Sequence, residues 1–108
     1  MIVVDVPEYL PIGSVITVKG SEKTLMIVGR SLLVDDDDQG KVYYDYSACF
    51  YPEGLIGDMV IYTNHECIET VVSRGYEDAY CMALGKMIQG VAEGIEVPKG
   101  HFEQSGEW

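Results

Sequence analysis

The spacing of apolar residues changes once along this chain, and that change limits the fold more than any other feature. Up to Ser73, short runs rich in β-branched and aromatic residues are separated by turn residues, and Ser14–Lys19 alternates as strands do when one face lies in a core. From Asp78 onward, apolar residues recur at intervals of three and four, as on one face of a helix. Strands followed by a single helix predict an α+β fold.

Turn-forming residues divide the first part of the chain. Asp35–Asp38 repeat like charges before Gly40, which predicts an exposed hairpin tip. The expected strands are Ser14–Lys19, Thr24–Val28 with an extension to Leu33, Val42–Phe50, Met59–Tyr62 and Ile68–Ser73, and Ile2–Val6 is a further short candidate. We therefore expect a small, twisted antiparallel sheet of about five strands. Whether it curls toward a barrel is left open.

The single helix is expected to begin at Asp78, where Glu77 and Asp78 favour a helix N-terminus through the macrodipole. Gly94 and Pro98 end it. We expect it to pack on one side of the sheet through one apolar stripe, formed by Tyr80, Leu84, Met87, Ile88 and Val91. These boundaries predict a single domain over residues 1–93 and a loose, polar C-terminal tail over 94–108.

Length and charge narrow the class of protein. The 108 residues suit one domain, and 47% are hydrophobic, too many for a disordered acidic chain. The formal net charge is −11, from 7 basic and 18 acidic side chains, which would repel nucleic acid and anionic membranes. Met1–Val4 is followed at once by Asp5, unlike a signal peptide, and no apolar run is long enough to span a membrane. We expect a soluble, cytoplasmic protein.

The cysteines and histidines do not form a recognisable zinc or catalytic pattern. Three widely spaced cysteines, Cys49, Cys67 and Cys81, argue against a disulfide framework and are expected to be reduced and mostly buried. Only His65 and Cys67 lie close in sequence, and His101 is remote in the tail. We expect His65 to order a turn, and we expect no catalytic residue and no metal site here.

The acidic run resembles the start of a calcium-binding EF-hand loop but does not continue as one. The twelfth loop position, counted from Asp35, is Tyr46, where a bidentate glutamate is needed, and the flanking segments are predicted strands. We interpret Asp35–Asp38 as a solvated turn. No cofactor is therefore expected.

The chain contains eight tyrosines, and several lie between Val42 and Tyr51 on both faces of one predicted strand. A core on one side of a sheet needs aromatic rings on only one face, and Tyr is enriched in protein interfaces. We therefore expect either Tyr43 or Tyr51, with Phe50 as the next candidate, to contact a protein partner.

Several short motifs occur in an order that resembles a known family. They are Leu10–Val15, Leu25–Arg30, Tyr44–Tyr46, Tyr51–Gly54, Asn64–Glu66 with Ile68, and Gly75–Glu77. This order resembles a small bacterial family of unknown domain function, encoded beside LXG polymorphic toxins of the Gram-positive type VII secretion system. The chain departs from that pattern at Cys67, where an acidic residue is expected, and in the tail from Gly94 to Trp108.

The resemblance implies a cytosolic, non-enzymatic accessory protein, similar to an adaptor or chaperone. Its partner would be an LXG toxin or the small helical proteins associated with the toxin. Two alternatives remain open: an immunity protein that blocks a toxin domain, and a small enzyme. An immunity protein would abolish toxicity, an export factor would tolerate an active toxin, and an enzyme would collect polar side chains of perturbed pKa in a pocket.

Overall fold

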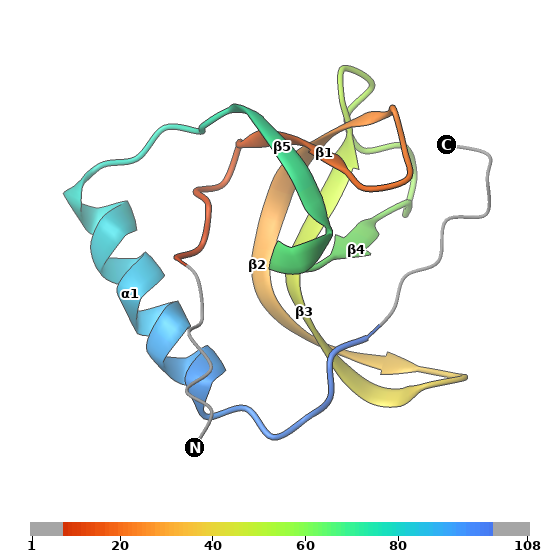
Figure 1. The fold of residues 1–108 in the computed structure, drawn as a ribbon, viewed down its shortest axis with the longest axis vertical. Helices are drawn as coiled ribbons and strands as arrows, with labels where there is room; N and C mark the ends of the chain where they lie inside the picture. The colour runs from red at the N-terminus through yellow and green to blue at the C-terminus, as the bar shows by residue number, and fades with distance from the viewer. Residues whose placement is uncertain (1–7, 101–108) are drawn as a thin grey trace.

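The structure is a computed structural model and describes residues 8–100. It contains five strands, one short 3-10 helix (η1) and one α-helix (Figure 1). In chain order they are β1 (Val15–Val18), β2 (Thr24–Asp36), β3 (Gly40–Phe50), β4 (Ile61–Thr63), η1 (His65–Cys67), β5 (Ile68–Ser73) and α1 (Ala79–Glu93). The candidate strand Ile2–Val6 and His101 lie outside the described residues.

The five strands form one antiparallel sheet in the order β4-β3-β2-β1-β5. Consecutive strands pair from β1 to β4, and the chain then turns through η1 so that β5 returns beside β1 (Figure 1). Within residues 8–100, β4 pairs only with β3 and β5 only with β1, so the sheet is not closed into a barrel. The predicted α+β fold is confirmed.

Strands β2 and β3 form a long hairpin, from Leu25 opposite Phe50 to Asp36 opposite Gly40. At its tip, Oδ1 of Asp36 accepts hydrogen bonds from the backbone N–H groups of Asp38, at 2.8 Å, and Gln39, at 2.9 Å. These two bonds hold the pKa of the Asp36 carboxyl below its usual value, since they favour its charged form. The prediction of an exposed hairpin tip at the acidic run is confirmed.

Strand β2 contains an irregularity beside Gly29. The pairing with β3 shifts register between Ile27 and Gly29. A Cβ atom on Gly29 would lie 2.2 Å from Oγ of Ser47, a residue of β3 that is buried. The absence of a side chain at Gly29 therefore allows the two strands to approach each other at this point.

Helix α1 lies beside the sheet (Figure 1). The side chain of Asp78 caps it, accepting a hydrogen bond from N–H of Cys81 at 2.9 Å. Ile88 and Ala92 pack against the main hydrophobic cluster. The members of that cluster are Tyr9, Leu10, Ile16, Val18, Leu25, Ile27, Tyr46, Ala48 and Ile61.

The predicted packing face of α1 is wrong for four of its five residues. Only Ile88 packs against the core, whereas Tyr80, Leu84, Met87 and Val91 are exposed to solvent. The helix carries apolar residues on two neighbouring faces, and the face with Ile88 and Ala92 is the one turned toward the sheet. Spacing alone did not reveal which face would be covered.

The segment that follows α1 returns to the sheet. The N–H of Tyr43 donates to the carbonyl of Pro98, and the N–H of Gly100 donates to the carbonyl of Tyr43, both at 2.9 Å. A Cβ on Gly100 would lie 2.4 Å from the ring of Tyr44, so the chain passes directly against that ring. Within the expected loose tail, residues 98–100 are thus attached to β3 by backbone hydrogen bonds.

No helix among residues 8–100 is both long enough and apolar enough to cross a membrane.

Candidate protein-binding surfaces

A polar cluster is enclosed between β3, η1 and residues 98–100, and Asp45 is its centre. The Asp45 side chain is almost completely buried. It accepts hydrogen bonds from Nζ of Lys99 at 2.8 Å, from the backbone N–H of His65 at 2.9 Å and from the hydroxyl of Tyr9 at 3.1 Å. A buried carboxylate requires such compensation, and here one cation and two neutral donors supply it.

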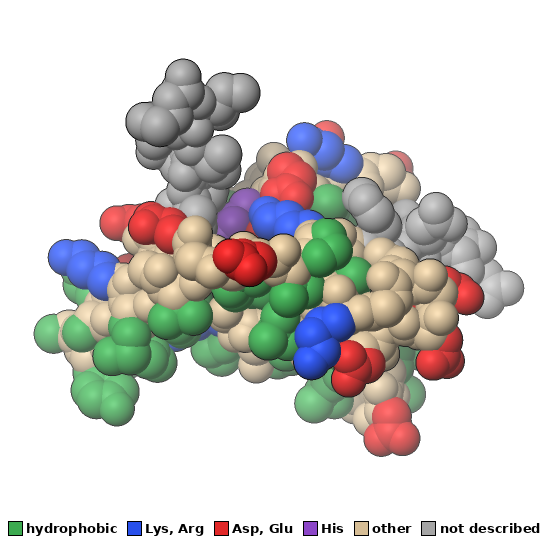
Figure 2. Space-filling model, turned by 90° about the horizontal axis from the view of Figure 1, so that it is seen from below, with side chains coloured by type: hydrophobic (Ala, Val, Ile, Leu, Met, Phe, Trp, Pro, Cys, Tyr) green, Lys and Arg blue, Asp and Glu red, His purple; other side chains and the backbone are tan. Residues whose placement is uncertain are grey.

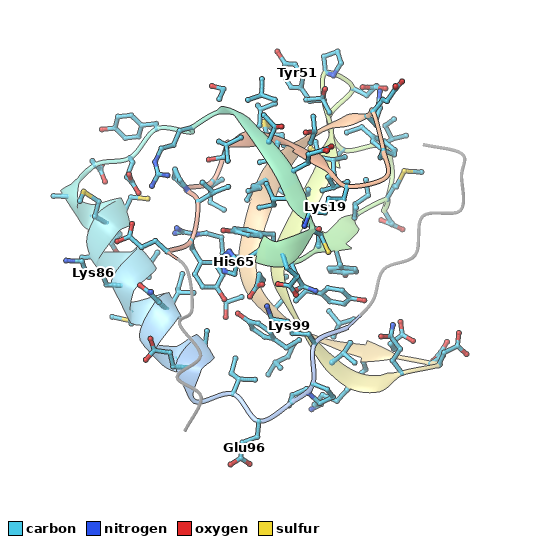
Figure 3. All side chains as sticks on the ribbon, in the orientation of Figure 1. Lys19, Tyr51, His65, Lys86, Glu96 and Lys99 are labelled. Carbon is cyan, nitrogen blue, oxygen red and sulfur yellow. The ribbon has the colours of Figure 1, made fainter. Side chains whose placement is uncertain are left out.

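His65 occupies the same cluster (Figure 3). The N–H of Leu10 donates to the Tyr46 hydroxyl at 2.8 Å, and that hydroxyl lies 3.1 Å from Nδ1 of His65. We assign the hydroxyl proton to this second contact, which places the imidazole proton on Nε2, 3.6 Å from Oδ1 of Asp45. Burial lowers the pKa of His65 and favours this neutral form, although the Asp45 charge opposes the shift. His65 is the first residue of η1, and its ring contacts β3 through the Tyr46 hydroxyl.

Tyr43 also belongs to this cluster and not to the surface. Its side chain is 4% exposed, and its hydroxyl hydrogen-bonds to that of Tyr9. Burial raises the pKa of Tyr43, and it raises the pKa of Tyr46 to about 12, so both phenols are protonated at neutral pH. The expectation that the second face of β3 is open to a partner is wrong, because residues 42–49 are all buried.

The polar cluster links three segments of the chain through Lys99. Lys99 also contacts Glu66 of η1 at 3.0 Å, so one ammonium joins the segment after α1 to β3 and η1. Burial alone would lower the pKa of Lys99, but hydrogen bonds to the Asp45 and Glu66 carboxylates outweigh it and raise that pKa.

The described residues contain no group of three or more His, Cys, Asp or Glu side chains placed to hold a metal ion. The three cysteines are free, and Cys49 is the buried one.

Tyr51, the second predicted contact residue, lies on the surface. It is 48% exposed and begins the loop between β3 and β4, at the end of the molecule away from His65 and Lys99 (Figure 3). Three further large apolar side chains of this loop are about half exposed: Leu55, Ile56 and Met59. We call these four residues the Tyr51 surface.

The backbone around the Tyr51 surface is held by hydrogen bonds. The N–H of Tyr51 donates to Thr24 at 2.9 Å, and the N–H of Gly54 donates to Phe50 at 2.7 Å. Glu53 forms an ion pair with Lys23, whose ammonium lies 5.3 Å from the centre of the Phe50 ring. Phe50, the third predicted contact residue, is partly buried and packs against the core. It therefore supports the loop more than it extends the surface.

A second exposed apolar surface runs along α1. We call Tyr80, Leu84, Met87 and Val91 the α1 stripe; their exposed fractions are 81%, 39%, 66% and 61%. Figure 2 shows hydrophobic side chains gathered on the side of the molecule that carries α1. Large exposed apolar patches on a folded domain are typical of protein contact sites. The sequence pattern identified these residues but assigned them to the core.

The sequence pattern did not identify the other three residues of the Tyr51 surface, Leu55, Ile56 and Met59, as exposed. Leu55 and Ile56 stand between Gly54 and Gly57, in a segment with turn residues on both sides. Adjacent apolar residues inside a turn-rich segment cannot both face one core, and this signal could have identified them.

Comparison with known protein families gives a match over most of the chain. The model of a family described as domain of unknown function (DUF4176) matches residues 9–83. No curated protein and no solved structure gives a significant match. The matched region contains Asp45, His65 and the whole Tyr51 surface, whereas Leu84, Met87, Val91 and Lys99 lie beyond its end. Because the match covers well over half of the residues, the chain belongs to the DUF4176 family.

Proposed function

We propose that this chain is a non-enzymatic, cytoplasmic adaptor that binds a protein partner through the Tyr51 surface. One observation carries the proposal: four large apolar side chains stand exposed on a loop whose backbone is fixed by hydrogen bonds. A preformed apolar surface loses little conformational entropy on binding, so most of the contact energy remains available for affinity. Tyr51 is the aromatic anchor that such an interface favours.

The charge of the chain supports a partner with a basic surface. The net charge is −11, and Glu53 and Asp58 lie within the loop itself. An acidic protein attracts a basic surface over about 8 Å, the Debye length at physiological salt. Charge therefore governs the rate of encounter, and the apolar contacts govern how long the complex lasts.

The specific partner proposed is an LXG toxin, or one of the small helical proteins exported with it by the type VII secretion system. This part of the proposal is supported by the order of motifs from Leu10 to Glu77 that resembles the companions of those toxins. In this role the chain binds the toxin before export and presents it to the secretion machine.

The test measures binding kinetics against an LXG toxin of the same organism and against its small helical companions. Tyr51→Ala should speed dissociation and weaken binding by about thirtyfold, or about 2 kcal/mol, while the melting temperature stays nearly unchanged. Leu33→Ala, which removes an exposed apolar side chain from β2, is the matched control and should bind normally. Raising the salt concentration should lower the association rate of both variants alike.

Normal binding by Tyr51→Ala would contradict the assignment of the Tyr51 surface. Absence of binding to the toxin and to its helical companions would contradict the proposed partner. Co-expression separates export from immunity, because an adaptor leaves the toxin active and an immunity protein abolishes its toxicity.

A further inference from the structure

The loop that joins β3 to β4 (Figure 1) contains a tight turn at residues 56–59. Ile56 and Met59 pair across this turn in an antiparallel bridge, and the N–H of Met59 donates to the carbonyl of Ile56 at 3.1 Å. Gly57 has a φ of +58°, which residues with a Cβ seldom adopt, so the chain can reverse within two residues. Asp58 is the second of these two residues. It therefore lies at the apex of the turn, with Ile56 and Met59 on the two arms.

The Asp58 carboxylate is an unpaired charge with apolar neighbours. Within residues 8–100 it forms no hydrogen bond and no ion pair, whereas Glu53 of the same loop is paired with Lys23. Asp58 itself is exposed, and Ile56 and Met59 beside it are 53% and 51% exposed. About half of each apolar side chain is therefore open to a partner, on both sides of a free negative charge.

A protein that covers Ile56 and Met59 must also remove water from Asp58. The hydrogen bond across the turn fixes its apex, and the short Asp58 side chain cannot reach far beyond the contact. Burial of an unpaired carboxylate costs more free energy than two half-exposed apolar side chains return on contact. A stable contact therefore needs a positively charged donor in the partner, placed within an apolar surface.

An arginine meets this need better than a lysine. The guanidinium of arginine is more weakly hydrated than an ammonium, and it donates two parallel N–H bonds to a carboxylate. Its methylene groups can also pack on Ile56 and Met59, which flank the charge. The turn thus fits an arginine that is surrounded by apolar side chains.

A second copy of the chain does not supply such an arginine. The chain contains two arginines, Arg30 and Arg74. Arg74 is bound to Glu77 by hydrogen bonds of 3.2–3.4 Å, and Nη1 of Arg30 is buried within the domain. Two chains of net charge −11 also repel each other. The occupant that fits the turn is therefore a different protein.

We propose that Asp58 pairs with an arginine of the partner protein, and that apolar side chains around this arginine cover Ile56 and Met59. This pair forms only if the chain binds a protein through the Tyr51 surface, so it rests on the proposed function. It names the group of the partner that this surface recognises. Other acidic side chains accelerate the encounter from a distance, whereas Asp58 loses its water in the complex and slows dissociation.

The experiment measures binding kinetics of the full chain with an LXG toxin of the same organism and with its small helical companions. Asp58→Asn removes the charge but keeps the shape of the side chain, and Asn suits a turn as Asp does. This variant should raise the dissociation rate by about tenfold or more, because the partner's arginine is then buried without a carboxylate. Asp37→Asn makes the same change of charge at the exposed hairpin tip and should leave the dissociation rate unchanged.

Variants of the bound partner identify the arginine. Each arginine of the partner is replaced by glutamine in turn, and binding is measured with the unchanged chain and with Asp58→Asn. At one position the two substitutions together should weaken binding less than the sum of their separate effects. Such coupling in a double-mutant cycle is the sign of a direct pair.

The unchanged chain separates failure of this pair from failure of the proposed function. If it binds neither the toxin nor its companions, the proposed function is wrong, and the pair with it. If it binds, four results overturn the pair alone. They are an unchanged dissociation rate of Asp58→Asn, equal effects of the two asparagine variants, no partner arginine coupled to Asp58, and a dimer of the chain in sedimentation velocity that Asp58→Asn dissociates. Circular dichroism of each variant confirms that the fold is retained, since both aspartates are exposed.

Discussion

The ammonium of Lys99 lies 2.8 Å from the buried carboxylate of Asp45, although the two residues are 54 positions apart in the chain. Asp45 lies in the middle of β3, and Lys99 follows the last helix. This contact makes the segment after α1 part of the folded domain.

Replacing Lys99 by Met should lower the free energy of unfolding by about 2 kcal/mol, because Asp45 then keeps its buried charge without a cation. Partial exposure of Lys99 keeps the effect below that of a fully buried pair. Urea denaturation measures the change. Lys19→Met, at an exposed position after β1, is the control and should change stability by less than about 0.5 kcal/mol. Equal stability of the two variants would mean that the contact between Lys99 and Asp45 does not stabilise the fold.

His65 should make stability depend on pH below about 6.5, the usual pKa of an unfolded histidine. Burial holds the folded pKa lower, so the unfolded chain binds a proton first as the pH falls. The free energy of unfolding therefore decreases from about pH 6.5 down to the folded pKa and does not change with this group above that range. His65→Gln should show a shallower decrease between pH 7.5 and 5.5 in urea titrations, with carboxylate contributions common to both proteins. An unchanged slope would contradict the buried, neutral histidine.

Ile88→Ala should destabilise the domain more than Leu84→Ala. Ile88 is half-buried against the core, so its truncation should cost about 1–2 kcal/mol, less than the loss at a fully buried site. Leu84 lies in the exposed stripe, and its truncation should cost less than about 0.5 kcal/mol. Thermal or urea unfolding of the two variants gives the comparison. The reverse order would show that the stripe faces the core after all.

Gly29→Ala should destabilise the sheet by about 1–3 kcal/mol, because the new methyl group would collide with Oγ of Ser47. The variant Ser47→Ala removes that oxygen, and the Ser47 Cβ lies 3.5 Å from the same position, an ordinary contact. The double variant should therefore recover part of the loss. A double-mutant cycle measures this coupling, and strict additivity would contradict the close approach of β2 and β3.

The strands could be predicted because their signals are local. The β-branched and aromatic residues of β2 and β3 and the acidic turn between them lie in one short stretch of chain, and the hairpin follows from them. The start of α1 just after Asp78 is local as well, since the acidic residues that favour a helix N-terminus and the helix period both lie within the segment. Strand β5 was likewise predicted with its observed bounds.

The predictions that were wrong depend on contacts between segments that are far apart in the sequence. Tyr43 was a reasonable interface candidate from the sequence of β3 alone. In the structure it is covered by Tyr9 and by residues 98–100, which are distant in the chain. The choice between the two apolar faces of α1 depends on where the helix meets the sheet, and helix periodicity contains no information on that. Burial of the Asp45 carboxylate is unfavourable without a cation beside it. The sequence did not predict this burial, because the cation, Lys99, lies at the other end of the domain.

Because Pro98–Gly100 bind to β3, a fragment of this chain that folds on its own should include them. A fragment ending where the family match ends, at Ala83, would retain all five strands but break off inside α1. It would lose Ile88 and Ala92 from the core and leave the Asp45 carboxylate without its counter-ion. Experiments on isolated fragments should therefore extend through Gly100.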